Sequence, residues 1–191
     1  MKTVKVALIA IITFTLANCG EESSPRPYAY PRIPLPEKVY SDAQLDTVYP
    51  YTFEMNENAS WKPVRDGFGW IDIEYPSLMA TVQITYKPVE DNLLQLTEEA
   101  HSLAYNHTVR ADGIVPESFR QPENDAFGIL YRFRGDAATT TQFFLTDSTN
   151  HFLRGVVYFY SPPNADSLRP ASNFMTEEVK HIMRTTQWNN K

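Results

Sequence analysis

Cysteine and glycine are scarce in this chain of 191 residues, which contains 1 Cys and 7 Gly. The single cysteine, Cys19, excludes an intrachain disulfide and a zinc site built from paired cysteines. The sequence shows neither a glycine-rich phosphate loop nor an internal repeat. Basic clusters are also missing, since 17 Lys and Arg stand against 23 Asp and Glu. Without a basic face to displace counterions, the chain is not expected to bind nucleic acid.

Aromatic residues and prolines are abundant instead, with 11 Tyr, 11 Phe, 3 Trp and 14 Pro. Aromatic side chains suit a pleated, half-buried surface and therefore favour β-sheet. A hydrophobic share of 42% is enough for a core, which excludes disorder of the whole chain. The length suits one ordinary domain once extended segments are set aside.

The N-terminus has the pattern of a bacterial export signal. Lys2 and Lys5 precede the charge-free run 6–17, which is too short to cross a bilayer of about 30 Å comfortably and fits a secretory h-region. The run ends in LANC (16–19), which resembles a lipobox, with Asn18 where Gly, Ala or Ser is usual. We therefore expect a lipoprotein signal peptide over 1–18 and lipid attachment at Cys19. The alternatives are a plain secretory signal or a short anchor helix.

Removal of this leader leaves 15 basic and 23 acidic side chains, a net charge of −8. The next segment, 19–47, is predicted to be a Pro/Tyr-rich tether. Five prolines fall within 25–36, and each fixes φ and biases its predecessor to extended geometry, so residues 20–36 should lack regular secondary structure. Tyr28 and Tyr30 are more apolar than a spacer requires, so the segment is either a spacer or a docking arm.

A single α+β globular domain is expected over 48–191. Period-two alternation predicts strands over 50–56, 68–75, 79–87, 126–134, 139–146 and 151–160, with a weaker, Pro116-interrupted strand over 114–121. Helical spacing predicts helices over 91–107, with Asp91 as N-cap, and over 171–187, with Asp166 or Ser167 as a cap. The fold class is an antiparallel sheet of about five to seven strands, a meander in its C-terminal half, covered by two or more helices.

Candidate catalytic and metal-binding residues are few. The four histidines lack metal-ligand spacing, and His101 and His181 are expected to face solvent. Asp147, Ser148 and His151 contain the residue types of a Ser-His-Asp triad, but Asp, Ser and Asn also suit a hairpin turn, which is the preferred interpretation. Arg132, Arg134 and Arg154 predict either a cationic strip or ion pairs. We expect no catalytic residue, no cofactor and no metal.

Several segments resemble the gliding motility lipoprotein GldD family of Bacteroidota. They are RPYAYPRI (26–33), YPYTF (49–53), YNHTVRADGI (105–114), QFFLTDSTNHFLRGVVYF (142–159), PNADSLRP (163–170) and the closing Trp188. The resemblance implies a lipid-anchored, non-enzymatic component of the gliding machinery, which is linked to type IX secretion and acts by protein contacts in the periplasm. It implies acylation, such as palmitate, at Cys19. The element order also resembles PsbP-like domains, as an analogy of fold alone.

Two other functions stay open from the residues alone. One is a periplasmic ligand-binding module with an aromatic cleft formed by Tyr131, Phe133, Tyr158 and Tyr160. The other is a cell-wall-acting enzyme that uses His107, Asp112, Asp147 and His151. The sequence does not decide between the inner and the outer membrane, and it does not name the protein partner.

Overall fold

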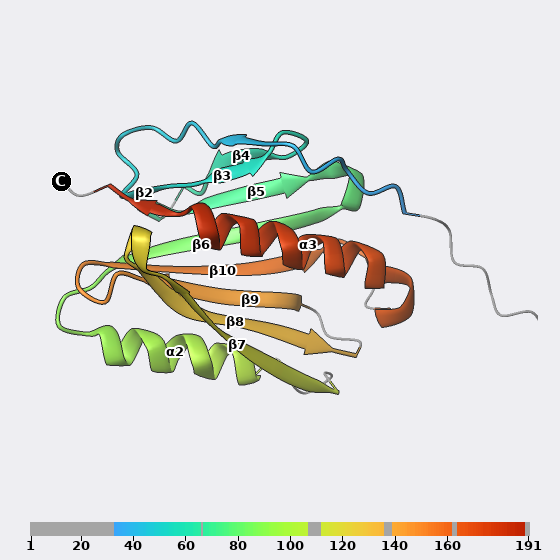
Figure 1. Ribbon diagram of the computed structural model, residues 1–191. Helices are drawn as coiled ribbons and strands as arrows, with labels where there is room; N and C mark the ends of the chain where they lie inside the picture. Colours follow the sequence, from blue (N-terminus) through green and yellow to red (C-terminus); the bar gives the residue numbers. More distant parts are fainter. Residues whose placement is uncertain (1–32, 66, 107–111, 136–138, 162–163, 190–191) are drawn as a thin grey trace, which may run out of the picture. The chain divides into compact units, whose positions relative to one another are not determined.

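The structure is a computed structural model that describes residues 33–65, 67–106, 112–135, 139–161 and 164–189. In this part of the chain, seven strands form one antiparallel sheet in the order β4-β5-β6-β10-β9-β8-β7 (Figure 1). They are β4 (Ser60–Pro63), β5 (Ile71–Tyr75), β6 (Ala80–Pro88), β7 (Gly113–Gln121), β8 (Ala126–Arg134), β9 (Thr139–Thr146) and β10 (His151–Phe159). The helices are α2 (Leu93–Asn106) and α3 (Ala165–Thr185).

Two short strand pairs complete the described structure. β1 (Tyr40–Asp42) pairs with β3 (Glu54–Asn56), and β2 (Tyr51–Thr52) pairs with β11 (Gln187–Trp188). The segment 19–47 is therefore not uniform, because its residues 40–42 form a strand while 33–36 lie outside any helix or strand. Residues 19–32 of the expected tether lie outside the described residues.

The sheet consists of two meanders joined edge to edge. β4, β5 and β6 follow one another, α2 then leads to the far edge, and β7 to β10 return strand by strand until β10 pairs with β6. Two 3₁₀ turns of similar build, η1 (Pro76–Leu78) and η3 (Pro122–Asn124), close the β5–β6 and β7–β8 hairpins. Each begins with Pro and ends before a residue of positive φ, Met79 or Asp125. Proline supplies the φ that the first turn position needs.

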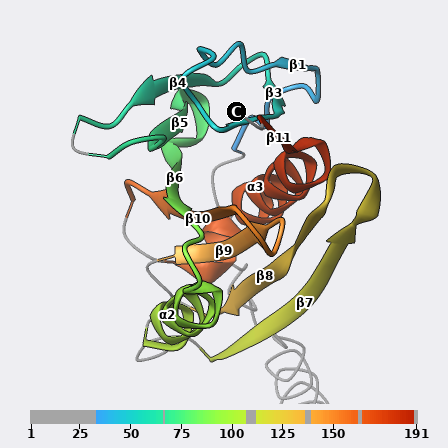
Figure 2. The same ribbon diagram turned by 90° about the vertical axis from the view of Figure 1, so that its left-hand side faces the viewer.

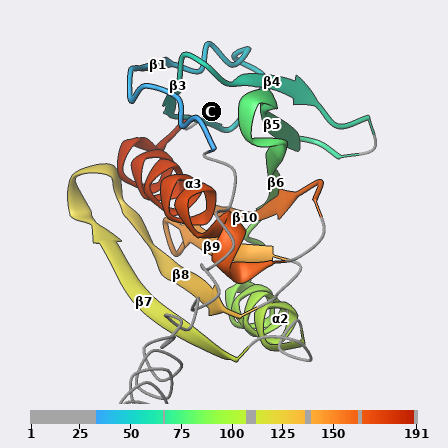
Figure 3. The same ribbon diagram turned by 90° about the vertical axis from the view of Figure 1, so that its right-hand side faces the viewer.

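The two helices cover opposite faces of the sheet (Figure 2). Along a strand, successive side chains point to opposite faces. Phe143 and Leu145 of β9 accordingly belong to the core cluster that contains α3, whereas Phe144 packs with the cluster under α2. The larger core lies on the α3 side. On that side the β7–β8 hairpin also reaches α3, since the amide of Asn124 donates to the carbonyl of Arg184 at 3.2 Å (Figure 3).

The predicted fold class is confirmed, and so is the C-terminal meander, in which β8, β9 and β10 are consecutive neighbours. Three boundaries differ. The strand predicted over 50–56 is interrupted at Phe53, because β2 and β3 pair with different partners. The strand predicted over 68–75 begins at Ile71, after a turn in which Gly69 has φ of 72°. The C-terminal helix begins at Ala165, six residues early.

The predicted helix caps are wrong. Asp91 has a φ of 57° and lies two residues before α2 starts at Leu93. The α3 cap is Asn164, whose side chain accepts from the Ser167 amide at 3.0 Å, rather than Asp166 or Ser167. Pro170 lies inside α3, although proline lacks the amide donor of a helix interior. It lies in the second turn, however, where only one intrahelical bond is lost, and the cap and the Arg169–Asp166 ion pair hold the first turn.

Gly155 of β10 allows a close approach that a larger residue would prevent. A Cβ atom at this position would lie 2.1 Å from the ring of Phe143 on β9. We expect Gly155→Ala to lower the free energy of unfolding by about 1–3 kcal/mol, the usual cost of overpacking a core. Gly113→Ala is the matched control, because a Cβ there meets no atom within 4 Å. Urea unfolding of both variants checks this, and equal stabilities would contradict it.

Candidate functional site

Cys19, the predicted lipid-attachment site, lies outside the described residues, as do Tyr28 and Tyr30 of the tether. The candidates within the described structure are therefore the residues predicted for catalysis and aromatic binding, and the polar side chains that tertiary contacts bring together.

Asp147, Ser148 and His151 form a turn and not a triad. One oxygen of Asp147, Oδ1, accepts from the backbone amides of Thr149, Asn150 and His151 at 3.0, 2.8 and 2.8 Å. Ser148 has a φ of 70°, as tight turns require. Burial would raise the pKa of the Asp147 carboxyl, but the hydrogen bonds from these amides outweigh it and lower the pKa. The turn interpretation explains all three residues.

His151 serves packing in this structure. Its side chain is 7% exposed, its Nδ1 lies 2.9 Å from the Tyr86 hydroxyl, and its ring stacks on Trp188 with centroids 5.1 Å apart. This contact ties the last strand of the described chain to β10. These contacts give His151 a structural role in packing.

The residues of the proposed enzyme do not come together. His107 lies outside the described residues. Asp112 is exposed at the Arg134 end of β8, where its amide donates to the Arg134 carbonyl at 2.9 Å. Asp147 follows Thr146, which pairs with Phe127 near the other end of β8. Seven residues of strand separate the two ends, about 23 Å, so Asp112 cannot act with Asp147 and His151.

The predicted aromatic cleft does not form either. Tyr131 and Phe133 pack into the cluster beneath α2. Tyr160, by contrast, is 69% exposed and accepts a hydrogen bond from the Thr81 hydroxyl. Of the four predicted residues, two thus pack in the core, Tyr158 on β10 is half-buried, and Tyr160 lies on the surface.

The three arginines do not share one strip. Arg132 lies on the same face of β8 as Leu130, the α3 face, and forms an ion pair with Glu117. Arg154 lies on the face of Phe152, beneath α2, and donates to the side-chain oxygen of Gln142 at 2.9 Å. Burial lowers the pKa of Arg154 from its ordinary value.

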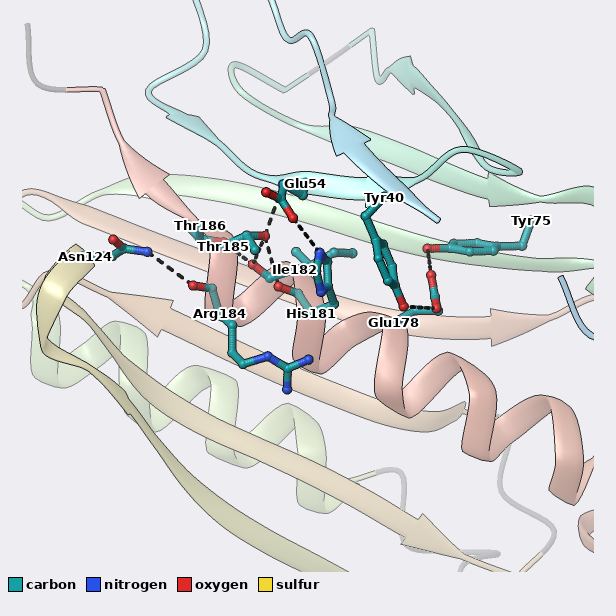
Figure 4. A network of polar contacts seen from close by, with 10 residues as sticks. All are labelled: Tyr40, Glu54, Tyr75, Asn124, Glu178, His181, Ile182, Arg184, Thr185 and Thr186. Carbon is teal, nitrogen blue, oxygen red and sulfur yellow. Dashed lines mark hydrogen bonds and ion pairs between the residues drawn. The ribbon is translucent and has the colours of Figure 1, made fainter. Parts of the chain in front are cut away.

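A buried carboxylate on α3 organises a polar network that sequence patterns did not reveal (Figure 4). Glu178 is 1% exposed and accepts hydrogen bonds from the hydroxyls of Tyr40 and Tyr75, at 2.8 and 3.2 Å. These two tyrosines come from β1 and β5. Burial, together with the adjacent carboxylate, raises the pKa of both hydroxyls above the usual value. Both phenols therefore stay protonated and donate.

The network continues along one side of α3. The ring of Tyr40 stacks on His181 with centroids 3.7 Å apart and an angle of 16°. His181 Nε2 lies 2.9 Å from Glu54 Oε2, and the Glu54 amide donates to the Thr185 hydroxyl at 3.1 Å. The β1–β3 pair is thus held to α3 by contacts that alternate between apolar stacking and hydrogen bonding. His181 was expected to face solvent, and that prediction is wrong. His101 is exposed as expected, and it also contacts the Tyr131 hydroxyl at 3.3 Å.

The described residues contain neither a membrane-spanning helix nor a cluster of metal ligands. None of their helices combines the length and the apolar character needed to cross a membrane. No group of three or more His, Cys, Asp or Glu side chains among them is arranged to hold a metal ion.

The fold and the network define an α+β domain whose segment nearest the N-terminus is fastened to its last helix. The sequence model of the gliding motility lipoprotein GldD family matches residues 20–188. Because the match covers most of the chain, the protein belongs to this family. It is accordingly a lipid-anchored lipoprotein of the cell envelope and a component of the gliding machinery. No protein with a curated description is similar enough to match the chain.

The Glu178 network predicts a measurable loss of stability. Tyr40→Phe removes one of the two phenols and leaves the carboxylate with Tyr75 alone. We expect the free energy of unfolding to fall by about 1–3 kcal/mol, the cost of leaving a buried acceptor short of a partner. Tyr49→Phe is the control, since Tyr49 packs on Tyr51 and Trp61 through ring contacts. Similar urea-unfolding midpoints for the two variants would argue against the network's role.

The lowered pKa of Asp147 predicts a stability difference that depends on pH. The carboxylate stabilises the fold fully above its unfolded pKa of about 3.9, and this contribution disappears as the pH falls through the lower folded value. Asp147→Asn keeps an oxygen acceptor but loses the charge. The wild type should therefore be more stable at neutral pH, and the two proteins should converge as the pH falls below the folded pKa of Asp147. Thermal melting across pH tests this, with Asp125→Asn on the β7–β8 turn as control; a constant difference would contradict it.

Proposed function

We propose that the protein is anchored through acylated Cys19, faces the periplasm and acts by contacts with other proteins of the gliding and type IX secretion machinery. Family membership carries this proposal, since the matched region begins one residue after Cys19. The charge-free run 6–17 and the single cysteine at its end support lipid attachment. Two or more acyl chains would make such an anchor stable.

The fold supports a role in contact and not in catalysis. The residues that sequence suggested for an enzyme are separated along β8 or used in a turn. The described side chains that are most tightly organised, Glu178 with Tyr40 and Tyr75, bind one part of the protein to another. Such an arrangement fixes where a tether leaves the domain.

The domain layout we propose combines the sequence pattern of the N-terminus with the contacts of Tyr40. Residues 1–18 are the leader, 19–47 the tether with its last part applied to the domain, and 48–191 the α+β domain. β1 lies in that last part and is fastened to α3 through Tyr40. A force applied at the anchor would thus be transmitted through β1 to α3 and to the sheet beneath it.

The anchor is tested by Cys19→Ser in cells that glide. We expect the variant to lose incorporation of labelled palmitate, to stay as an uncleaved precursor or leave the membrane fraction, and to stop colony spreading. The physical reason is that a thiol is the acceptor and serine is not. Equal label in the variant would exclude Cys19 as the lipid site.

A control separates the anchor from export itself. In this second variant a non-lipoprotein secretory leader replaces 1–18 and Ser replaces Cys19, so that the same domain is exported without a lipid. The abundance of this variant reports whether the domain folds, and spreading of the cells that carry it reports whether an anchor is needed. Normal spreading would show that anchoring is dispensable. Crosslinking from intact cells, with secretion of a type IX cargo measured alongside, tests the protein contacts; a wild-type anchored protein that captures no machinery component would contradict the proposal.

A further inference from the structure

A cavity with both polar and apolar walls lies between the first half of α3 and the ends of β7, β8 and β9. Its volume is about 300 Å³. The side chains that matter for its chemistry are Arg132 and Arg134 of β8, Thr140 of β9, and Arg169, Ser172 and Thr176 of α3. The cavity is separate from the Glu178 network, which occupies the second half of the same helix.

The cavity lies beside α3 because two sides of this helix differ in character. On the side that packs in the core, Phe174, Met175 and Val179 are buried. On the side that borders the cavity the helix carries Ser172 and Thr176, which are too small to fill the space. The Thr176 hydroxyl is satisfied by Thr141 and by the Ser172 carbonyl, both at 2.9 Å. An amphipathic helix that served packing alone would carry large apolar residues here.

The cavity walls hold more donors than their neighbours use. Arg132 pairs with Glu117, yet its buried Nε has no hydrogen-bond partner among the described residues. The same holds for the buried hydroxyl of Thr140, which lies where β9 shifts register against β10. Arg169 pairs with Asp166, whereas Arg134 makes no ion pair with any described residue. Unsatisfied buried donors are costly and rare in folded proteins, so they indicate a missing acceptor.

We propose that this cavity binds a phosphate group, carried by a small phosphate ester or by a lipid headgroup. Arginines of both the sheet and the helix line the cavity, together with residues that carry hydroxyl groups. A tetrahedral phosphate accepts from several directions, whereas a planar carboxylate matches a single guanidinium fork. The start of α3 adds the positive end of the helix dipole. The volume admits a group the size of glycerol phosphate, near the lower limit for ligand sites of about 300–1,000 Å³.

Calorimetric titration of the full lipidated chain in neutral detergent tests the proposal with inorganic phosphate and then glycerol phosphate. We expect binding of both and none of acetate at matched ionic strength. Arg134→Gln should weaken binding on the order of tenfold to a hundredfold, the loss of one charge-assisted contact. Arg120→Gln, on the same hairpin and outside the cavity, removes the same charge and should leave affinity within about twofold. Phosphatidic acid added to the same micelles distinguishes the two sources of phosphate. Competition with glycerol phosphate would indicate a lipid headgroup, and lack of competition would indicate a soluble phosphate ester.

Ser172→Leu adds a second, independent measurement. The larger side chain would fill the cavity, so we expect the melting temperature to hold or rise while phosphate binding is lost. Absence of binding in the wild type, equal losses in Arg134→Gln and Arg120→Gln, binding of acetate as tightly as phosphate, or undiminished binding in Ser172→Leu would each overturn the proposal. None of these readouts depends on gliding, so the outcome is independent of the proposed function.

Discussion

Burial of the apolar face of α3 against the sheet joins parts of the chain that are far apart in sequence. Met175, Val179 and Met183 are fully buried, in one cluster with β5, β6, β8, β9 and β10. Each such side chain contributes about 1.5–3 kcal/mol when removed from water. The same helix carries the contacts that hold β1 and β3, and it is followed by β11, which pairs with β2. The first and last described segments of the domain therefore depend on one packing interface.

The hydrogen bonds of Glu178 fix the position of α3 in that interface. A carboxylate in an apolar interior is costly unless it is hydrogen-bonded, and here Tyr40 and Tyr75 provide the donors. Because the tyrosines come from β1 and β5, the carboxylate has both hydrogen bonds only when β1 and the sheet are in place. Apolar packing alone would tolerate small shifts of α3, whereas this pair of bonds specifies one position. With the anchor that we propose at Cys19, the arrangement would link the segment before β1 to the core.

The side of α3 that borders the cavity differs from the side that packs in the core. It carries Ser172 and Thr176, and the sheet opposite presents arginines and an unsatisfied threonine hydroxyl. One helix thus holds β1 on one side and borders the cavity on another. A ligand in the cavity would contact the same rigid element that holds β1, without any change of fold.

Local patterns determined the elements that depend on neighbouring residues. Alternation in 126–134, 139–146 and 151–160 predicted three strands, and short turns between them left adjacent antiparallel pairing as the simplest arrangement, which β8, β9 and β10 adopt. The Asp147 turn was likewise readable, because its hydrogen bonds span four residues. Family membership was readable from segments spread along the chain. Each of these features is encoded by residues close together in sequence or by their order.

Tertiary structure alone decided the features that join distant residues. Tyr40 and Glu178 are 138 positions apart, and no periodicity shows that a phenol on one will meet a carboxylate on the other. The break at Phe53 has the same origin, since β2 and β3 pair with different strands that lie elsewhere in the sequence. Arg132 and Arg154 looked alike in sequence but lie on opposite faces of the sheet. Their chemistry depends on which helix covers each face, and only packing of the whole chain sets that.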